Sequence, residues 1–204
     1  MSLRTRWATD ADVRQIAQLW HRSWLDAHER LIPRRALAHC TQHSFVKRAL
    51  GCVYEEDTTS LRSRRPTALL AEVDSKLMAF TVIRGGNEIE HFFVQASAHG
   101  TGVASTLLQH AELVMQDERG SETAWLVCAT GNARALKFYE KHAWARTPRQ
   151  SWMNPAPWVP SLIGSDMDAA LTDNEVAATT LRCTAMKKML GFDANPNDGA
   201  YKTW

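Results

Sequence analysis

A turn with two glycines, His99-Gly100-Thr101-Gly102, stands between a hydrophobic strand pattern and an amphipathic helix pattern. The first amide groups of a helix have no partner within the helix, and they carry partial positive charge. Glycines directly before such a helix let an anion approach the backbone closely, because they have no side chain. This stretch therefore predicts that main-chain N–H groups bind a phosphate group.

The spacing of this turn excludes two common phosphate loops. A nucleoside triphosphate site needs Lys followed by Ser or Thr after the glycines, and no such pair is present here. The dinucleotide pattern Gly-x-Gly-x-x-Gly is broken by Ser105. A Gly-x-Gly before a helix is compatible with several nucleotide-binding families, so a second motif is needed to choose between them.

A second block, residues 132–144, follows one predicted strand later and reads NARALKFYEKHAW. Asn132 is suited to cap a helix, Ala135 keeps one helix face small, and Phe138 and Tyr139 project one turn later. The two blocks together resemble the signature motifs of the GCN5-related N-acetyltransferase (GNAT) superfamily. The first is usually written [Gln/Arg]-x-x-Gly-x-[Gly/Ala], and the second Asn-x-x-Ala-x-x-Phe-Tyr-x-x-x-Gly-Phe. The chain departs from them at three positions, where His99 replaces Gln or Arg, Ala143 replaces Gly and Trp144 replaces Phe.

The resemblance implies that acetyl-CoA binds across both blocks. The cofactor pyrophosphate would lie on the turn and the helix start, which comprise His99, Gly100, Thr101, Gly102, Val103 and Ala104. The pantetheine arm would bond to the strand backbone at Phe93 and Val94, and it would pass Asn132, Ala135 and Phe138. The reaction that the resemblance implies requires no metal.

The resemblance also assigns candidate catalytic residues. Tyr139 would protonate the departing thiolate, since a phenol and a CoA thiol have similar proton affinities. An amine acceptor must lose a proton before it attacks, and Glu88 or Glu90 would accept that proton. Strict alternation along this strand predicts that Glu88, Glu90, Phe92 and Val94 share one face and that His91 lies on the other. Cys128 is interpreted as a small core residue rather than a nucleophile.

Trp24 and His28 are candidate substrate-wall residues, because the stretch from Trp24 to Leu31-Ile32-Pro33 resembles the segment that overhangs the acceptor site in this family. A second interpretation of Trp24 is that it belongs to the core, since large aromatic residues at helical spacing are usually buried.

Two short segments could hold other sites. His39 and His43 lie one helical turn apart and could be read as metal ligands, but no further convergent ligands accompany them. The mixed polar segment 54–66 is predicted to be a loop.

The order of predicted strands and helices indicates an α/β (α+β) fold with a mixed, mostly antiparallel sheet and helices on both faces. This fold must position the residues named above. Strands are predicted at residues 3–7, 67–73, 77–84, 88–94, 124–129 and 180–190, and helices from residue 13 and over residues 35–50. The order strand, turn, helix, strand makes the strands on either side of the glycine turn parallel neighbours. By resemblance to the family, this parallel pair would splay apart and admit the cofactor.

The 204 residues, of which 45% are hydrophobic, suffice for one domain over residues 1–190, with an insertion near residues 150–178 and an irregular tail at 191–204. A helix is predicted within the insertion at residues 166–178. The Trp- and Pro-rich stretch 151–160 could cover the acceptor, cover the core or contact a second subunit of a homodimer. A net charge of +2 is too small to indicate nucleic acid or membrane binding. Four widely spaced cysteines without a signal peptide indicate a cytoplasmic protein.

We therefore expect an N-acetyltransferase that moves an acetyl group from acetyl-CoA to a primary amine, favouring a small molecule, by direct attack in a ternary complex. Two alternatives stay open. One is a non-catalytic acyl-CoA-binding sensor or subunit, and the other is an acetyltransferase for proteins or aminoacyl-tRNA.

Overall fold

The computed structural model describes residues 2–31, 37, 40–56, 64–147, 153–154 and 181–190. Within these residues one sheet has the strand order β1-β4-β5-β6-β7-β10-β8, and β9 also pairs with β10. Its strands are β1 (Leu3–Trp7), β4 (Ala68–Val73), β5 (Lys76–Arg84), β6 (Glu88–Val94), β7 (Thr123–Ala129), β8 (Ala145–Arg146), β9 (Met153–Asn154) and β10 (Leu181–Met189). All neighbouring strands are antiparallel except β6 and β7. The predicted mixed, mostly antiparallel sheet is confirmed.

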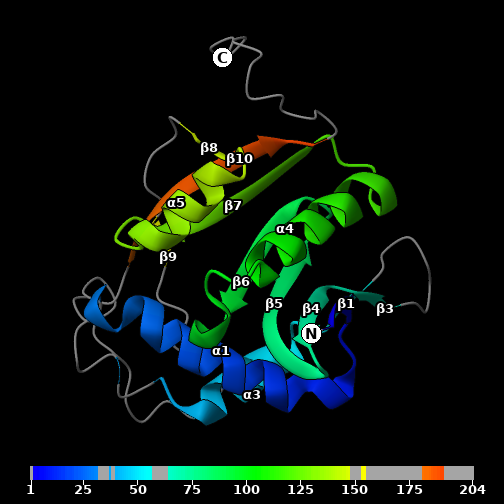
Figure 1. Cartoon of the computed structure of the whole chain (residues 1–204), viewed down its shortest axis with the longest axis vertical. Coiled ribbons are helices and arrows are strands. Elements are labelled where there is room, and N and C mark those ends of the chain that lie inside the picture. Colours follow the sequence, from blue (N-terminus) through cyan, green and yellow to red (C-terminus); the bar gives the residue numbers. More distant parts are fainter. Residues whose placement is uncertain are drawn as a thin grey trace.

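Four α-helices cover the two faces of this sheet in the described part of the chain: α1 (Val13–His28), α3 (Gln42–Leu50), α4 (Val103–Leu113) and α5 (Ala133–Lys141). A single π-helical turn, Val114–Glu118, extends α4. Short 3-10 turns occur at Asp10–Asp12, Glu29–Leu31 and Ala96–Ala98. Figure 1 shows α1 and α3 together at one end of the molecule, and α5 beside β7 and β10 at the other. None of the helices in these ranges is long and apolar enough to cross a membrane.

The first helix forms as its sequence pattern predicts. Thr9 and Asp12 make a reciprocal capping box just before it, in which the Thr9 amide donates to the Asp12 carboxylate at 2.8 Å. The apolar stripe of α1 is buried, and Trp20 and Trp24 are only 1% and 2% exposed, which confirms the core interpretation of Trp24. This stripe packs on β5 through Phe80.

The central strands are buried on both faces, because their successive side chains point alternately into two helical layers. Leu70 of β4 packs with the α1 and α3 layer, whereas its neighbour Leu69 packs with α4. A tight turn joins β4 to β5 through Asp74 and Ser75, both of which have positive φ. This is the backbone geometry that two-residue hairpins prefer.

The parallel pair holds together over a short distance. Backbone pairing between β6 and β7 is limited to Glu88 with Trp125 and Ile89 with Leu126. Figure 1 shows β7 and β10 running away from β6 beyond that point. The predicted splayed pair is therefore present.

Two boundaries differ from the sequence prediction. The segment 54–66 was predicted to be a loop, but Tyr54–Glu56 (β2) and Arg64–Pro66 (β3) pair as an antiparallel ribbon. The sequence of this segment shows no alternation of apolar and polar residues, so its pattern did not predict a strand pair. The helix predicted over residues 35–50 is described as α3 from Gln42 only. Thr41 is extended and its hydroxyl caps the helix by accepting from the Ser44 amide.

Several predicted features lie outside the described residues. They are His39, most of the Trp- and Pro-rich stretch, the helix predicted at 166–178 and the tail at 191–204. The closing strand was predicted at 180–190 and is observed as β10, between β7 and the short strand β8.

Candidate active site

A cavity of about 310 Å³ opens where β6 and β7 separate. Its walls come from β6, β7, the start of α5, the end of α1 and the turn before α4. Pairing stops at Ile89 and Leu126, so beyond these residues the facing backbone edges of the two strands do not bond to each other. The cavity therefore exists because the sheet is split along its parallel pair.

The glycine turn leads directly into α4, as its sequence predicts. Gly100 and Gly102 have φ values of 77° and 91°, a left-handed conformation that favours glycine. The first helical amides of α4 carry no hydrogen bond to any acceptor in the described part of the chain. They belong to Gly102, Val103, Ala104 and Ser105. The side chain of Val103 is buried in the core, so this residue can offer a ligand only its backbone.

Basic side chains surround this helix start. His99 and Arg134 both line the cavity, and an Arg134 guanidinium nitrogen lies 3.4 Å from Nδ1 of His99. Arg134 also pairs with Asp26 of α1 at 2.8 Å. His142 of α5 lies 3.0 Å from the Ser105 hydroxyl. An anion bound at the unpaired amides would therefore meet positive potential from the helix start and from the Arg134 guanidinium.

Sequence reasoning did not single out Arg134, Asp26 or His142. Arg134 lies inside the second signature block, which was the signal that could have identified it. His142 also lies within this block, whereas the pairing of Asp26 with Arg134 depends on how α1 and α5 pack.

The second block forms α5 with the cap that was predicted. The Asn132 side chain accepts a hydrogen bond from the Ala135 amide at 3.1 Å. Asn132, Ala135, Phe138 and Tyr139 all line the cavity. The cap thus fixes the helix start that places these side chains along the gap between β6 and β7.

Tyr139 lies deep in this wall and is 6% exposed. Its ring contacts Phe92, Phe138 and Trp144, with centroid distances of 6.1, 5.4 and 6.0 Å. Its hydroxyl has no hydrogen-bond partner among the residues that the structure describes. Burial raises the pKa of Tyr139, with a smaller contribution from Cys128, so the phenol stays protonated at neutral pH. It is a proton donor without a fixed acceptor.

The two candidate carboxylates occupy different positions. Glu90 lines the cavity and Glu88 does not. A Glu90 oxygen is 2.8 Å from Nε of Arg84. Burial, and secondarily the charge of Glu90, raises the pKa of Glu88. Of the two carboxylates, Glu90 is the one that a molecule in the cavity can reach.

The predicted alternation along β6 is wrong at this point. The register between β5 and β6 shifts between Val82 and Ile83, which leaves Glu90 as an extra residue on β6. Glu90 and His91 consequently point to the same side, with 4.0 Å between a carboxylate oxygen and Nε2 of His91. Phe92 packs with α5 on the other face, whereas His91 contacts Trp20 of α1.

The α1 wall brings Ser23 and His28 to the cavity. The Ser23 hydroxyl donates to the carbonyl of Val94 at 3.1 Å, which ties α1 to the end of β6. Nδ1 of His28 lies 2.9 Å from the carbonyl of Trp24 and therefore donates to it, so Nε2 remains as an acceptor in the neutral ring. Burial lowers the pKa of His28. Trp24 does not line the cavity but lies in the core, with its ring stacked on His28 at 5.0 Å.

Comparison with known proteins agrees with this geometry. The model of the acetyltransferase (GNAT) family matches residues 16–144, which is more than half of the chain. No curated protein sequence matches the chain significantly.

Solved structures share the fold at low sequence identity. The GCN5-related N-acetyltransferase of Rhodopseudomonas palustris is 16% identical with a TM-score of 0.63, over 93% of this chain and 97% of that one. The PaiA N-acetyltransferase of Thermoplasma acidophilum, solved with coenzyme A, is 15% identical with a TM-score of 0.55, over 93% and 99%. The ribosomal-protein-S18-alanine N-acetyltransferase of Escherichia coli is 15% identical with a TM-score of 0.53, over 98% and 100%. With the family match over both signature blocks, the chain belongs to the acetyltransferase (GNAT) family.

Proposed function

We propose that this protein transfers an acetyl group from acetyl-CoA to a primary amine by direct attack in a ternary complex, with a small molecule as the favoured acceptor. Family membership supports an acyl-CoA-dependent acetyltransferase in general. The observation that carries the proposal is the continuous cavity between β6 and β7. It runs past the glycine turn at His99 and Gly100 and reaches both Tyr139 and Glu90.

The cofactor would lie along this cavity in an extended form. Its pyrophosphate would accept hydrogen bonds from the unpaired amides that begin α4, near His99 and Arg134. Its pantetheine arm would bond to the backbone of β6 at Phe93 and Val94 and pass Ala135. These assignments use the cavity-lining residues and the sequence resemblance together.

Two proton transfers complete the proposed reaction. The amine nitrogen attacks the thioester carbonyl carbon, and the Glu90 carboxylate, directly or through water, accepts the proton that the amine gives up. The tetrahedral intermediate then breaks its carbon–sulfur bond. The Tyr139 hydroxyl donates its proton to the departing thiolate, which suits a phenol that burial keeps protonated. Glu88 is the second candidate for the base, although it lies outside the cavity wall.

The acceptor would enter on the α1 side of the cavity. Glu90 supplies a negative charge that favours a cationic amine, and His28 presents an imidazole nitrogen that can accept a hydrogen bond. Trp24 would act behind His28 by holding its ring, because the two rings stack and Trp24 is itself buried.

A two-stage experiment tests the proposal. Thermal unfolding is first measured with and without acetyl-CoA, and release of free thiol is then followed against a panel of small amines, peptides and aminoacyl-tRNA with a chelator present. We expect acetyl-CoA to raise the melting temperature and small amines to support thiol release. Stabilisation without turnover for any acceptor would indicate a sensor, turnover only with peptides or aminoacyl-tRNA would overturn the acceptor class, and no stabilisation would overturn the whole proposal.

Tyr139→Phe belongs in the same assay, with Tyr54→Phe as the matched control outside the cavity wall. We expect Tyr139→Phe to lower kcat by about 10²-fold or more while leaving acetyl-CoA stabilisation intact. Undiminished turnover in Tyr139→Phe would remove this residue as the proton donor.

A further inference from the structure

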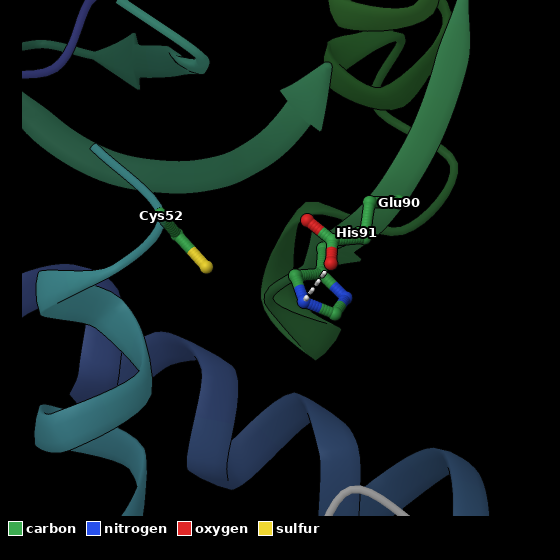
Figure 2. Close-up of side chains that lie close together, drawn as sticks. All are labelled: Cys52, Glu90 and His91. Carbon is green, nitrogen blue, oxygen red and sulfur yellow. Dashed lines mark ion pairs between the residues drawn. The ribbon is translucent and has the colours of Figure 1, made fainter. Parts of the chain in front are cut away.

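Three potential metal ligands of different chemistry converge beside the cavity: Cys52, Glu90 and His91. Cys52 follows α3 in the chain, whereas Glu90 and His91 lie at the bulge of β6. One ligand atom from each residue lies within 4.8 Å of the other two. Figure 2 shows the Cys52 sulfur pointing across a short gap toward the Glu90 carboxylate and the His91 ring.

The bulge in β6 is what creates this convergence. In a regular strand Glu90 and His91 would point to opposite faces. The extra residue turns both side chains toward the end of α3. Cys52 lies there and is 5% exposed. The cluster thus depends on two segments, the end of α3 and the bulge of β6, and neither of them supplies all three ligands.

Sulfur, imidazole nitrogen and carboxylate oxygen are the three donor types that zinc takes in proteins. Around a tetrahedral zinc ion, neighbouring donor atoms lie about 3.3–3.8 Å apart, since the bonds are about 2.0–2.3 Å long. The observed limit of 4.8 Å is wider by about one ångström. Binding of an ion would therefore require the three donor atoms to move closer together by about one ångström.

The surroundings support the two ligands on β6. Nε of Arg84 holds one oxygen of Glu90 at 2.8 Å, which leaves the other oxygen facing His91. Hydrogen-bonded carboxylate ligands of this kind are typical of protein metal sites. The His91 ring is held between Trp20 and Phe93, at centroid distances of 4.4 and 6.4 Å.

Charge also has to be balanced at such a site. Cys52 is a free, buried cysteine, so its thiol would have to lose a proton to bind an ion. A divalent ion would displace that proton, because thiols bind zinc as thiolates. Two negative ligands then offset the two positive charges of the ion, and the Arg84 guanidinium remains on the outer oxygen of Glu90.

We infer that Cys52, Glu90 and His91 form a three-ligand site for a zinc-like divalent cation, with its open coordination position on the cavity side. The cavity side is assigned because Glu90 and His91 line the cavity. The cation site shares Glu90 with the proposed acetyl transfer, so a bound ion would compete with the role of that carboxylate as a base. The inference itself does not depend on the proposed reaction.

Cobalt is the probe that tests the site, because Co²⁺ replaces zinc and absorbs visible light when a thiolate binds it. The full-length protein is titrated with Co²⁺ under reducing conditions. We expect one equivalent to give a thiolate-to-cobalt charge-transfer band and Zn²⁺ to abolish it. Cys52→Ser should lose the band, whereas Cys40→Ser, the matched control at the other end of α3, should keep it.

A second variant keeps the inference testable even if Cys52→Ser does not fold. Glu90→Gln retains the sulfur ligand, so we expect it to keep the band but to weaken Co²⁺ binding by about tenfold or more. Circular dichroism of each variant monitors folding. A wild-type protein without the charge-transfer band, a band that survives in folded Cys52→Ser, or unchanged affinity in Glu90→Gln would each overturn the inference.

Discussion

Ile89 of β6 and Leu126 of β7 form the last backbone pair between the two parallel strands, and both residues line the cavity that opens next to them. Their side chains are 3% and 1% exposed in the core beneath α4 and α5. The core thus holds β6 and β7 together at Ile89 and Leu126, and no backbone pairing joins the two strands beyond these residues. No pairing between β6 and β7 has to be broken when a ligand arm enters this gap, although the Val94 carbonyl already accepts a hydrogen bond from Ser23.

Ala135→Leu should close this gap. Ala135 lines the cavity and is half-buried, so three added carbon atoms would project into the space left for the pantetheine arm. Overfilling a packed site costs about 1–3 kcal/mol, which corresponds to an increase of about 5- to 150-fold in the Kd for acetyl-CoA. Isothermal titration calorimetry measures this change.

Ala133→Leu is the control for that substitution, because Ala133 begins the same helix but is exposed. Its Kd should stay within about twofold of the wild-type value. Equal weakening by both substitutions would mean that helix α5 itself was disturbed and that Ala135 does not lie along the cofactor path.

Gly102→Ala should destabilise the protein through its backbone. Gly102 has a φ of 91°, and an added Cβ would meet no atom within 4 Å, so the cost is conformational rather than steric. A left-handed residue with a side chain costs about 1–2 kcal/mol. We expect this loss in the free energy of unfolding, measured by urea denaturation, and a weaker stabilisation by acetyl-CoA.

Gly51→Ala is the matched control, because Gly51 has a φ of −80° and its added Cβ would make only an ordinary contact at 3.5 Å. Its stability should be unchanged or higher by about 0.5 kcal/mol. A loss in Gly51→Ala as large as that in Gly102→Ala would contradict the backbone argument.

Local sequence patterns predicted the parts of the fold whose cause is local. The α1 stripe with Trp20, the cap at Asn132 and the glycine turn each depend on neighbouring residues, and each is observed. The bulge at Glu90 could not be predicted, because it arises from the register between β5 and β6 rather than from the composition of β6. The Arg134–Asp26 pair likewise joins residues of α5 and α1 that are far apart in the sequence.

Asp12→Asn should remove an acid-sensitive contribution to stability. Asp12 accepts two hydrogen bonds from Arg6 at 2.8 Å, and these are the main reason that its pKa falls from 3.8 to about 2. The folded state therefore favours the charged carboxylate. The resulting stability is present above about pH 4 and is lost as the pH falls through about 2.

The size of this effect follows from the shift in pKa. Since one unit corresponds to about 1.4 kcal/mol, Asp12→Asn should lower the free energy of unfolding by about 2 kcal/mol at pH 7. The difference from the wild-type protein should shrink toward zero near pH 2. Asp117→Asn, at an exposed position on the π-helical turn, should change stability little at either pH. A deficit in Asp12→Asn that is as large at pH 2 as at pH 7 would contradict this account.

Glu90→Gln and Glu88→Gln together decide which carboxylate accepts the proton of the amine. Only Glu90 lines the cavity, and the amide that replaces it can still accept a hydrogen bond from Arg84. We therefore expect Glu90→Gln to fold normally and to retain stabilisation by acetyl-CoA. Its kcat/KM for the amine at neutral pH should fall by about 10²-fold, whereas that of Glu88→Gln should fall by less than about threefold, measured by thiol release with a chelator present.

The pH dependence of this loss separates proton transfer from simple binding. At neutral pH an amine acceptor is mostly protonated and needs a base, but near its own pKa a large fraction of it is already neutral. The deficit of Glu90→Gln should therefore shrink as the pH rises toward 10. A deficit that stays constant with pH would show that Glu90 only attracts the cationic amine, and a larger loss in Glu88→Gln would move the base outside the cavity.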